Sequence, residues 1–580
     1  MSGTRRPTSA VPASSLVMRS WCASRKASGG RWPGIGTPRP PLRQPLPDVV
    51  APGSPDPPVS QSFSLQAVSR SAFILTGGAT LAQALAIGRE LFLAAQLGVS
   101  AELDALFIAL ALPTTLAGVL TSGVVTALVP IYIGLRDESG PLEARRFAGG
   151  VIVWVGLFGL GASVLVGLLA EVAVAVTGPG LDPSGRAAAV GYLRLLAPMA
   201  FVATVSSILY AVCQAEERFA GIAVANLATP AVALTAIVLL WQQLGLTAVA
   251  IGSLLGPVVG ALFLYLTTVR ADMAPRPTLR VSRAALGAFT RHAAPLTLSA
   301  AVLQVNTVVD RAIASILAPG GVSALRFAEL LARAPIGVIA PAWGSAIYPA
   351  LVRAAAEPDV AALGRAAGRT IRYGIALFLP LAALTVAVAP VAVTVAYGRG
   401  AFSATDIALT IPIVAAFAPL VLILMVSPIL TGSHNARQRG QVLLGGGILN
   451  AILNLVLDVS LGATIGVVGI ALSSTITSAL VLLYFVWQLN RREPGVEPRG
   501  IARTLVLAAA AVAPGAIVIG AVAWAGLVPA GLGPGLAALA LFGALGLLAY
   551  GAAAWFLRIV EIRTFIVQVR SWASSRLAPS

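Results

Sequence analysis

Long apolar segments alternate with short polar connections from about residue 71 to residue 558 of the chain. Each segment exceeds the roughly 18 residues that a helix needs to cross a hydrocarbon core of about 30 Å. The pattern therefore predicts an all-α polytopic membrane protein with about fourteen transmembrane helices. The expected helices are 71–98, 104–133, 148–176, 190–214, 221–243, 246–269, 293–318, 322–352, 370–398, 406–432, 441–461, 464–489, 502–528 and 533–558.

The composition points the same way. Of the 580 residues, 57% are hydrophobic and 11% are charged, and the mean hydropathy is +0.89. Soluble proteins have about 25% charged residues. This chain has too few charges to cover its surface with them, so most of that surface must face lipid.

The placement of the charges indicates an orientation. The formal net charge is +17, and the basic residues lie mostly between the apolar segments, which is typical of cytoplasmic loops. With the N-terminus inside, 23 arginines fall on the cytoplasmic side, and the opposite loops keep only Arg186 and Arg399. Both termini are therefore expected in the cytoplasm. A nucleic-acid-binding protein is excluded, because it would gather its basic residues in one soluble module.

An internal repeat relates two six-helix halves of the chain. Because six is an even number, both halves have one orientation and form two lobes related by a pseudo-two-fold axis along the membrane normal. Two parallel halves are typical of transporters, which bind their substrate between them. A shift of 222 positions places Arg89, Gly98 and Pro113 on Arg311, Gly320 and Pro335, and a shift of 217 places Gly245, Thr247 and Gly252 on Gly462, Thr464 and Gly469.

The domain organisation follows from the repeat. Residues 1–66 are rich in Pro, Ser, Gly and Arg and lack both hydrophobic periodicity and a signal-peptide apolar region, so we expect a disordered basic tail. Two C-terminal helices fall outside the repeat. The expected regions are the tail 1–66, an N-lobe 67–270, a C-lobe 271–490, the helix pair 491–560 and a cytoplasmic tail 561–580.

Charged residues inside the expected helices are the first candidate site. A charge at the bilayer centre costs about 2.5–3.5 kcal/mol, so it usually faces a wet cavity or a partner. Guanidinium groups in such a cavity would suit a diphosphate, whose oxygens they bind with paired hydrogen bonds. The alternative is a set of structural ion pairs, in which Arg89 pairs with Glu90 or Asp104, and Glu329 pairs with Arg326 or Arg333. The candidate substrate-cavity residues are Arg89, Glu90, Asp104, Arg311, Arg326, Glu329 and Arg333.

A second candidate site consists of oxygen ligands. Asn450, Asn454 and Asp458 recur every four residues and share one face of helix 441–461, while Asp310 lies on helix 293–318. Together with Ser473, Ser474 and Thr475 on helix 464–489, they form an all-oxygen set suited to a hard cation such as Na⁺. The alternative is a polar seam in which the same groups bond between helices.

No catalytic motif stands out. The chain lacks a P-loop, a GxSxG motif and a paired-histidine motif, and its longest internal loop, 271–292, is too short to hold a sugar donor or an ATPase. Cys22 and Cys213 cannot form a disulfide framework or a metal cluster. His292 and His434 are expected as solvated loop residues. We therefore expect a transporter and not an enzyme.

Several segments resemble one known family. Residues 104–105, 112–113 and 129–130 (Asp-Ala, Leu-Pro and Val-Pro) are similar to the second-helix pattern of the MurJ (MviN-like) lipid II flippases. These belong to the multidrug/oligosaccharidyl-lipid/polysaccharide (MOP) exporter superfamily. Residues 397–403 read YGRGAFS and residues 436–438 read ARQ, as in that family, and residues 328–349 resemble its eighth helix. The resemblance covers residues 70–490.

The resemblance implies a function. Such a flippase moves lipid II, a polyprenyl-diphosphate sugar of peptidoglycan biosynthesis, from the cytoplasmic to the periplasmic leaflet of the bacterial inner membrane by alternating access. Other cell-wall synthesis proteins are implied as partners. The alternatives are a flippase for another polyprenyl-diphosphate oligosaccharide, such as a capsule or exopolysaccharide unit, and a MATE-like cation-coupled drug exporter. A non-transporting membrane scaffold would not explain the buried charges.

The resemblance also implies site residues. Arg89, Glu90 and Asp104 match polar positions of the family. We expect no cofactor apart from Na⁺ as a coupling ion. The chain departs from the family pattern where Gln83, Ala117 and Leu330 replace arginines and Arg333 replaces an acidic residue, so the cavity differs from the usual one. The positions that match the Na⁺ ligands of some members are Asp310, Asn454, Asp458, Ser474 and the carbonyl of Ile470.

Overall fold

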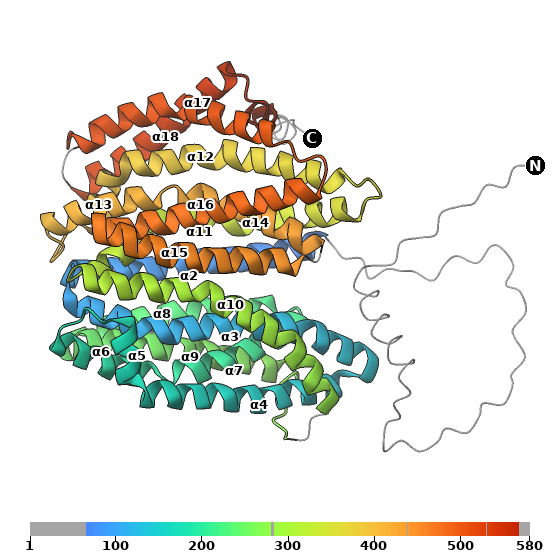
Figure 1. Ribbon diagram of the computed structural model, residues 1–580. Coiled ribbons are helices and arrows are strands. Elements are labelled where there is room, and N and C mark those ends of the chain that lie inside the picture. The colour runs from blue at the N-terminus through green and yellow to red at the C-terminus, as the bar shows by residue number, and fades with distance from the viewer. Residues whose placement is uncertain (1–64, 280–282, 438, 529–530, 568–580) are drawn as a thin grey trace, which may run out of the picture. The chain divides into compact units, whose positions relative to one another are not determined.

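The computed structural model describes residues 65–279, 283–437, 439–528 and 531–567, and this part of the chain is helical throughout, without strands. The expected tail 1–66 lies almost wholly outside the described residues, and so does the end of the cytoplasmic tail. Within the described part, long helices run side by side in a first bundle (α2–α9), a second bundle (α10–α16) and a C-terminal pair (Figure 1).

The first bundle begins at the end of the undescribed segment. Helix α3 forms its centre and packs against α4, α6 and α7, while α8 packs against both α2 and α9. Its helices are α2 (Leu65–Leu97), α3 (Ala101–Ser139), α4 (Pro141–Leu168), α5 (Ala170–Thr177), α6 (Pro183–Leu196), α7 (Met199–Ala215), α8 (Phe219–Leu244) and α9 (Leu246–Arg270).

The second bundle repeats this order, and the C-terminal pair packs on its α12. Helix α10 is shared between the bundles, because it packs along α3 as well as against α15. The helices are α10 (Arg283–Leu317), α11 (Gly321–Ala356), α12 (Ala362–Tyr397), α13 (Ala404–Phe417), α14 (Leu420–Ala436), α15 (Gly440–Ile465) and α16 (Val467–Arg492), followed by α17 (Pro498–Trp524) and α18 (Leu532–Phe556).

Two expected single helices are each broken at a proline. Pro198 separates α6 from α7, and Pro419 separates α13 from α14. Proline has no N–H to donate and crowds the preceding turn, which explains the interruption. The two prolines lie 221 positions apart, so the same break occurs in both copies of the repeat.

The turns correct one of the repeat alignments. Gly245 (φ +52°) joins α8 to α9, and Gly466 (φ +64°) joins α15 to α16. Both turns need the left-handed backbone that glycine adopts without strain. Gly462 lies inside α15, so the shift of 217 that aligned it with Gly245 is wrong. The structural shift here is 221.

Eleven helical stretches in the described part are long and apolar enough to cross a membrane, with α6–α7 and α13–α14 each counted as one. Helices α2, α10 and α11 fall outside these eleven, although they contain 33, 35 and 36 residues. The expected count of fourteen is therefore not confirmed and stays a prediction.

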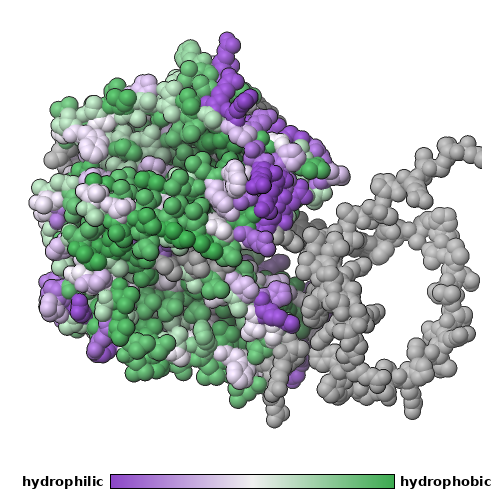
Figure 2. Space-filling model, viewed as in Figure 1, coloured by the Kyte–Doolittle hydropathy of each residue, from purple (hydrophilic) through white to green (hydrophobic). Residues whose placement is uncertain are grey.

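The outer surface confirms a multi-pass membrane protein. Large apolar side chains such as Trp154, Phe158 and Leu168 of α4 are exposed, and Figure 2 shows hydrophobic residues over the middle of the visible face. So large an exposed apolar surface requires lipid.

The two ends of the bundles differ in character. The arginine-rich end carries Arg136, Arg270, Arg353, Arg437 and Arg491, at or near the C-terminal ends of α3, α9, α11, α14 and α16. The opposite end, here called the glycine-turn end, contains the turns at Gly98, Gly245, Gly320 and Gly466, all with positive φ.

Neither histidine lies in a loop. Helix α14 continues to Ala436, so His434 belongs to its last turn, is fully buried and packs on Phe485. The expectation of a solvated loop residue is wrong for His434. His292 is exposed as expected, but it lies on α10.

Candidate functional site

A polar cavity opens inside the second bundle and brings the two candidate sites together. Its empty space, including the part open to the surroundings, is about 850 Å³. Three residues of the first candidate site line it, namely Arg311, Glu329 and Arg333. From the second candidate site Asp310, Asn450, Asn454 and Ser474 line it. The sequence predicted two separate sites for these sets, although Asp310 and Arg311 are adjacent in the chain. The other polar lining residues are Asn306, Thr307, Thr477 and Ser478.

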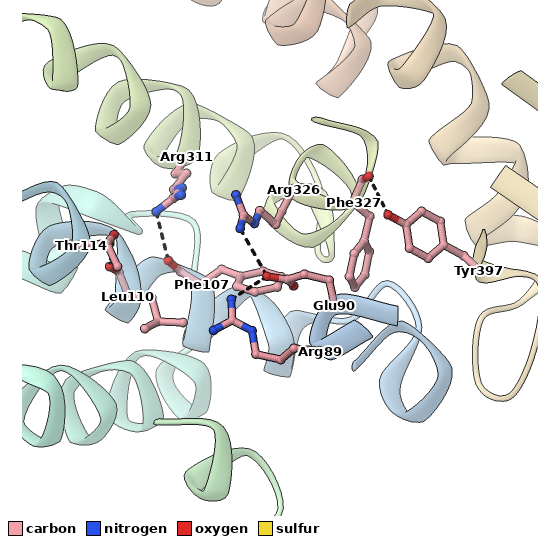
Figure 3. Close-up of polar contacts among 9 residues, drawn as sticks. All are labelled: Arg89, Glu90, Phe107, Leu110, Thr114, Arg311, Arg326, Phe327 and Tyr397. Carbon is pink, nitrogen blue, oxygen red and sulfur yellow. Dashed lines mark hydrogen bonds and ion pairs between the residues drawn. The ribbon is translucent and has the colours of Figure 1, made fainter. Parts of the chain in front are cut away.

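Arg333 is the arginine best placed to meet a ligand in this cavity. Its guanidinium lies 3.1 Å from the Glu329 carboxylate, one turn away on α11, and its side chain is 48% exposed. Arg311 donates a 3.5 Å hydrogen bond to the Phe107 carbonyl of α3 (Figure 3). Both groups keep unused N–H donors, since a guanidinium has five.

A second cluster of charges joins the two bundles. Glu90 of α2 is 1% exposed and lies between two guanidinium groups, 2.8 Å from Arg89 and 3.3 Å from Arg326 of α11 (Figure 3). Arg326 therefore pairs across the bundles and not with Glu329. These three side chains do not line the cavity described above; they form a buried ion pair network.

Asp104 also connects the bundles, but through the backbone. Its carboxylate accepts a 2.7 Å hydrogen bond from Ser323 N in the first turn of α11, and the side chain is 2% exposed. An acidic group at this place satisfies a free N–H and stabilises the helix terminus. Asp104 neither pairs with Arg89 nor lines the cavity. It holds α11 in place.

The structure brings the cation-site candidates together from three helices. Ser474 of α16 donates to Asp310 of α10 at 3.3 Å, and Asp458 of α15 lies beside Asp310. Asn454 precedes Asp458 by one turn of α15, and buried Ile470 precedes Ser474 by one turn of α16.

Several of these oxygens lack hydrogen-bond donors. Asp310 Oδ1, Asn454 Oδ1 and both carboxylate oxygens of Asp458 are buried and have no hydrogen-bond partner among the described residues. Buried acceptors without donors are costly, and two neighbouring carboxylates repel each other. A monovalent cation would relieve both. Within the described part of the chain, no group of three or more histidine, cysteine or acidic side chains could hold a metal ion.

Sequence reasoning missed Asn306, which lines the cavity and bonds to Asn450. The signal was present, because Asn306 precedes Asp310 by one helical turn and so shares its face. Thr477 and Ser478 were also missed, and a hydroxyl on an apolar helix gives no comparable signal.

Two helical bundles that face lipid on the outside and hold a polar cavity on the inside define a multi-pass membrane transporter. The sequence model of the lipid II flippase MurJ family matches residues 93–533. The chain belongs to this family. It is 27% identical to the probable lipid II flippase MurJ of Synechocystis over 76% of this chain and 85% of that one. It is 28% identical to the Rhizobium tropici protein of that description, over 82% and 91% of the two chains.

Solved structures share the fold. A lipid II flippase MurJ in an inward closed conformation matches with a TM-score of 0.70 at 20% identity, over 84% of this chain and 99% of that one. An inward-facing MATE family multidrug resistance transporter of the MOP superfamily matches with a TM-score of 0.60 at 18% identity, over 73% and 97%. The two-bundle fold expected from the repeat is thereby confirmed.

Proposed function

We propose that this protein moves lipid II across the bacterial inner membrane, from the cytoplasmic to the periplasmic leaflet, by alternating access. Membership of the lipid II flippase MurJ family carries this proposal. The cavity supports it, because Arg311 and Arg333 offer paired donors to a diphosphate while amides and hydroxyls face them as partners for sugar hydroxyls. The protein acts as a transporter and catalyses no reaction.

The experiment is rescue of a bacterium depleted of its own lipid II flippase. The intact chain should restore growth and cell shape, and an Arg311→Ala/Arg333→Ala variant expressed at the same level should not. Absence of rescue with normal membrane insertion would reject lipid II as the cargo. Mass spectrometry of co-purified polyprenyl lipids would then test for a capsule or exopolysaccharide unit.

A second candidate function rests on the fold alone. The similarity to a MATE multidrug resistance transporter is compatible with cation-coupled drug export. Arginines in the cavity disfavour a cationic substrate. Drug resistance conferred by the chain without rescue would favour this alternative.

The arginine-rich end is proposed to face the cytoplasm, with both termini on that side. The support is the positive-inside rule and the alternation of the helices. A membrane-impermeant thiol reagent added to intact cells with a permeable outer membrane should label a cysteine at Leu527, just after α17, and spare one at Arg353. The reverse pattern would invert the topology.

Na⁺ is proposed as the coupling ion, held by Asp310, Asp458, Asn454 and Ser474 with the carbonyl of Ile470. The unpartnered acceptor oxygens support this assignment. Na⁺ would bias the access states through its different affinities for them. Wild type should melt at a higher temperature in Na⁺ than in choline, and Asp458→Asn should abolish the difference. Equal melting of wild type in both salts would leave the polar seam as the better interpretation.

A further inference from the structure

The YGRGAFS segment contacts the other bundle at the glycine-turn end. It forms the connection between α12 and α13, where Ala401 N donates a 2.7 Å hydrogen bond to the Ala95 carbonyl in the last turn of α2. Asp406 caps α13 by accepting from Ser403 N at 2.9 Å. The same carboxylate oxygen accepts from Val99 N of the first bundle at 3.4 Å.

A matching contact joins the bundles in the reverse direction. The connection between α5 and α6 reaches the last turn of α10, where Gly180 N donates to Ser315 Oγ at 3.2 Å. The side chains that cap the following helices, Asp182 on α6 and Ser403 on α13, are 221 positions apart. Each bundle therefore extends the same connection to the end of the first helix of the other bundle.

Both contacts depend on a missing side chain. A Cβ atom at Gly400 (φ +66°) would lie 2.0 Å from the Ala95 carbonyl oxygen, and one at Gly180 would lie 1.9 Å from the Ser315 carbonyl oxygen. In each case the obstacle is backbone, which cannot move aside as a flexible side chain can. Glycine is thus the only residue that allows these approaches.

We propose that these two contacts form a reciprocal lock at the glycine-turn end, and that Gly180 and Gly400 are the positioning residues that let it close. The lock comprises Ala95 with 400–401 and Gly180 with Ser315. Opening the cavity toward this end requires the bundles to separate here, which breaks both contacts. Few hydrogen bonds hold each of them, so they can part without unfolding either bundle. The inference rests on the proposed alternating access and does not depend on the cargo.

The first experiment fixes the lock by a disulfide. In a Cys22→Ser/Cys213→Ala background, Ala95→Cys/Ala401→Cys should cross-link under mild oxidation, stop rescue and regain it on reduction. Each single variant is the control. A complete cross-link that leaves rescue intact would overturn the proposal.

The second experiment weakens the lock. A reporter Ser478→Cys, which lines the cavity, is labelled from the periplasm with an impermeant maleimide. Gly180→Ala and Gly400→Ala should each raise the labelling rate roughly tenfold, the effect of losing about one hydrogen-bonded contact. Gly466→Ala is the matched control, because it has φ +64° and no atom within 4 Å of its Cβ position.

If both variants are labelled at the same rate as Gly466→Ala, the two contacts are ordinary packing and the proposal is wrong. An increase in only one variant would overturn the reciprocal arrangement. Because labelling needs no lipid II, a wrong cargo would leave these results unchanged.

Discussion

The two bundles have the same arrangement of helices but different kinds of residues in their interiors. At the shift of 221, Asp458 and Asn454 of α15 correspond to Ile237 and Ala233 of α8. All four residues are buried. In the first bundle Ile237 belongs to the apolar core, whereas in the second Asn454 lines the cavity and Asp458 lies buried beside Asp310.

The same contrast holds on the first helix of each bundle. At the shift of 222, Asp310 of α10 corresponds to Gly88 of α2, while the neighbouring arginines Arg311 and Arg89 are present in both. The fold therefore does not need the acidic groups, since the first bundle folds without them. The buried carboxylates of the second bundle therefore call for another role, and the proposed cation site would provide one.

The largest expected effect on stability comes from introducing a buried carboxylate into the first bundle, at the position that corresponds to Asp458. Ile237→Asp should destabilise the protein by about 4 kcal/mol, because the first bundle offers a buried carboxylate neither a donor nor a cation. Monodisperse protein after detergent extraction is the measurement. Ile237→Val, the control, should cost only about 1 kcal/mol. Normal yield and melting of Ile237→Asp would show that the first bundle also accommodates a charge.

The arginine-rich end offers a second contrast, in which the charge is reversed. After α7 the turn carries Glu216, paired with Arg136 at 3.3 Å, and at the corresponding place after α14 it carries Arg437. Arg437 and Arg439 share one acid, Glu493, which is 2% exposed and lies 3.1 Å from Arg437. The second bundle thus closes this end around a buried carboxylate, and the first around a partly exposed one.

Removing these acidic side chains should lower the free energy of unfolding by unequal amounts. Glu493→Ala leaves two partly buried guanidinium groups without an acidic partner and should cost about 3 kcal/mol. Glu216→Ala should cost less, about 1 kcal/mol, because the Glu216 side chain is 18% exposed and that of Glu493 only 2%, and this loss includes the acceptor of the Tyr132 hydroxyl. Melting temperatures of both variants in one detergent check the order. Equal losses would show that burial does not distinguish the two pairs.

The cavity arginine tests function instead of stability. Arg333→Ala should lower transport roughly tenfold to a hundredfold, since charge-assisted hydrogen bonds contribute about 1.5–3 kcal/mol. Expression should stay normal, because the substitution removes a charge from the membrane interior. Arg353→Ala, on the same helix at the arginine-rich end, is the control and should transport normally. A joint loss of expression and transport in Arg333→Ala would favour a structural ion pair with Glu329.

The sequence carried most of the fold and only part of the site. The long apolar segments and the repeated glycine turns at Gly98 and Gly320 were enough to predict two helical lobes. Each of these features depends only on residues that are close together in the chain. The partner of Asp104 was not predictable, since it is the backbone N–H of Ser323, 219 positions away. Arg326 had Glu329 at helical spacing, yet tertiary packing brought Glu90 closer. Spacing shows which pairs are allowed, and packing decides which of them form.

The smallest expected effect on stability concerns two serines that correspond at the shift of 221. Ser474 donates to Asp310 at 3.3 Å, whereas the hydroxyl of Ser253 on α9 is buried without a hydrogen-bond partner among the described residues. Ser474→Ala should therefore cost about 1 kcal/mol, and Ser253→Ala should change stability by less than about 0.5 kcal/mol in either direction. Both melting curves are recorded in choline, so that cation binding does not contribute. A larger loss for Ser253→Ala would mean that its hydroxyl has a partner in the membrane-embedded protein, and the contrast between an apolar and a polar bundle would no longer hold at this position.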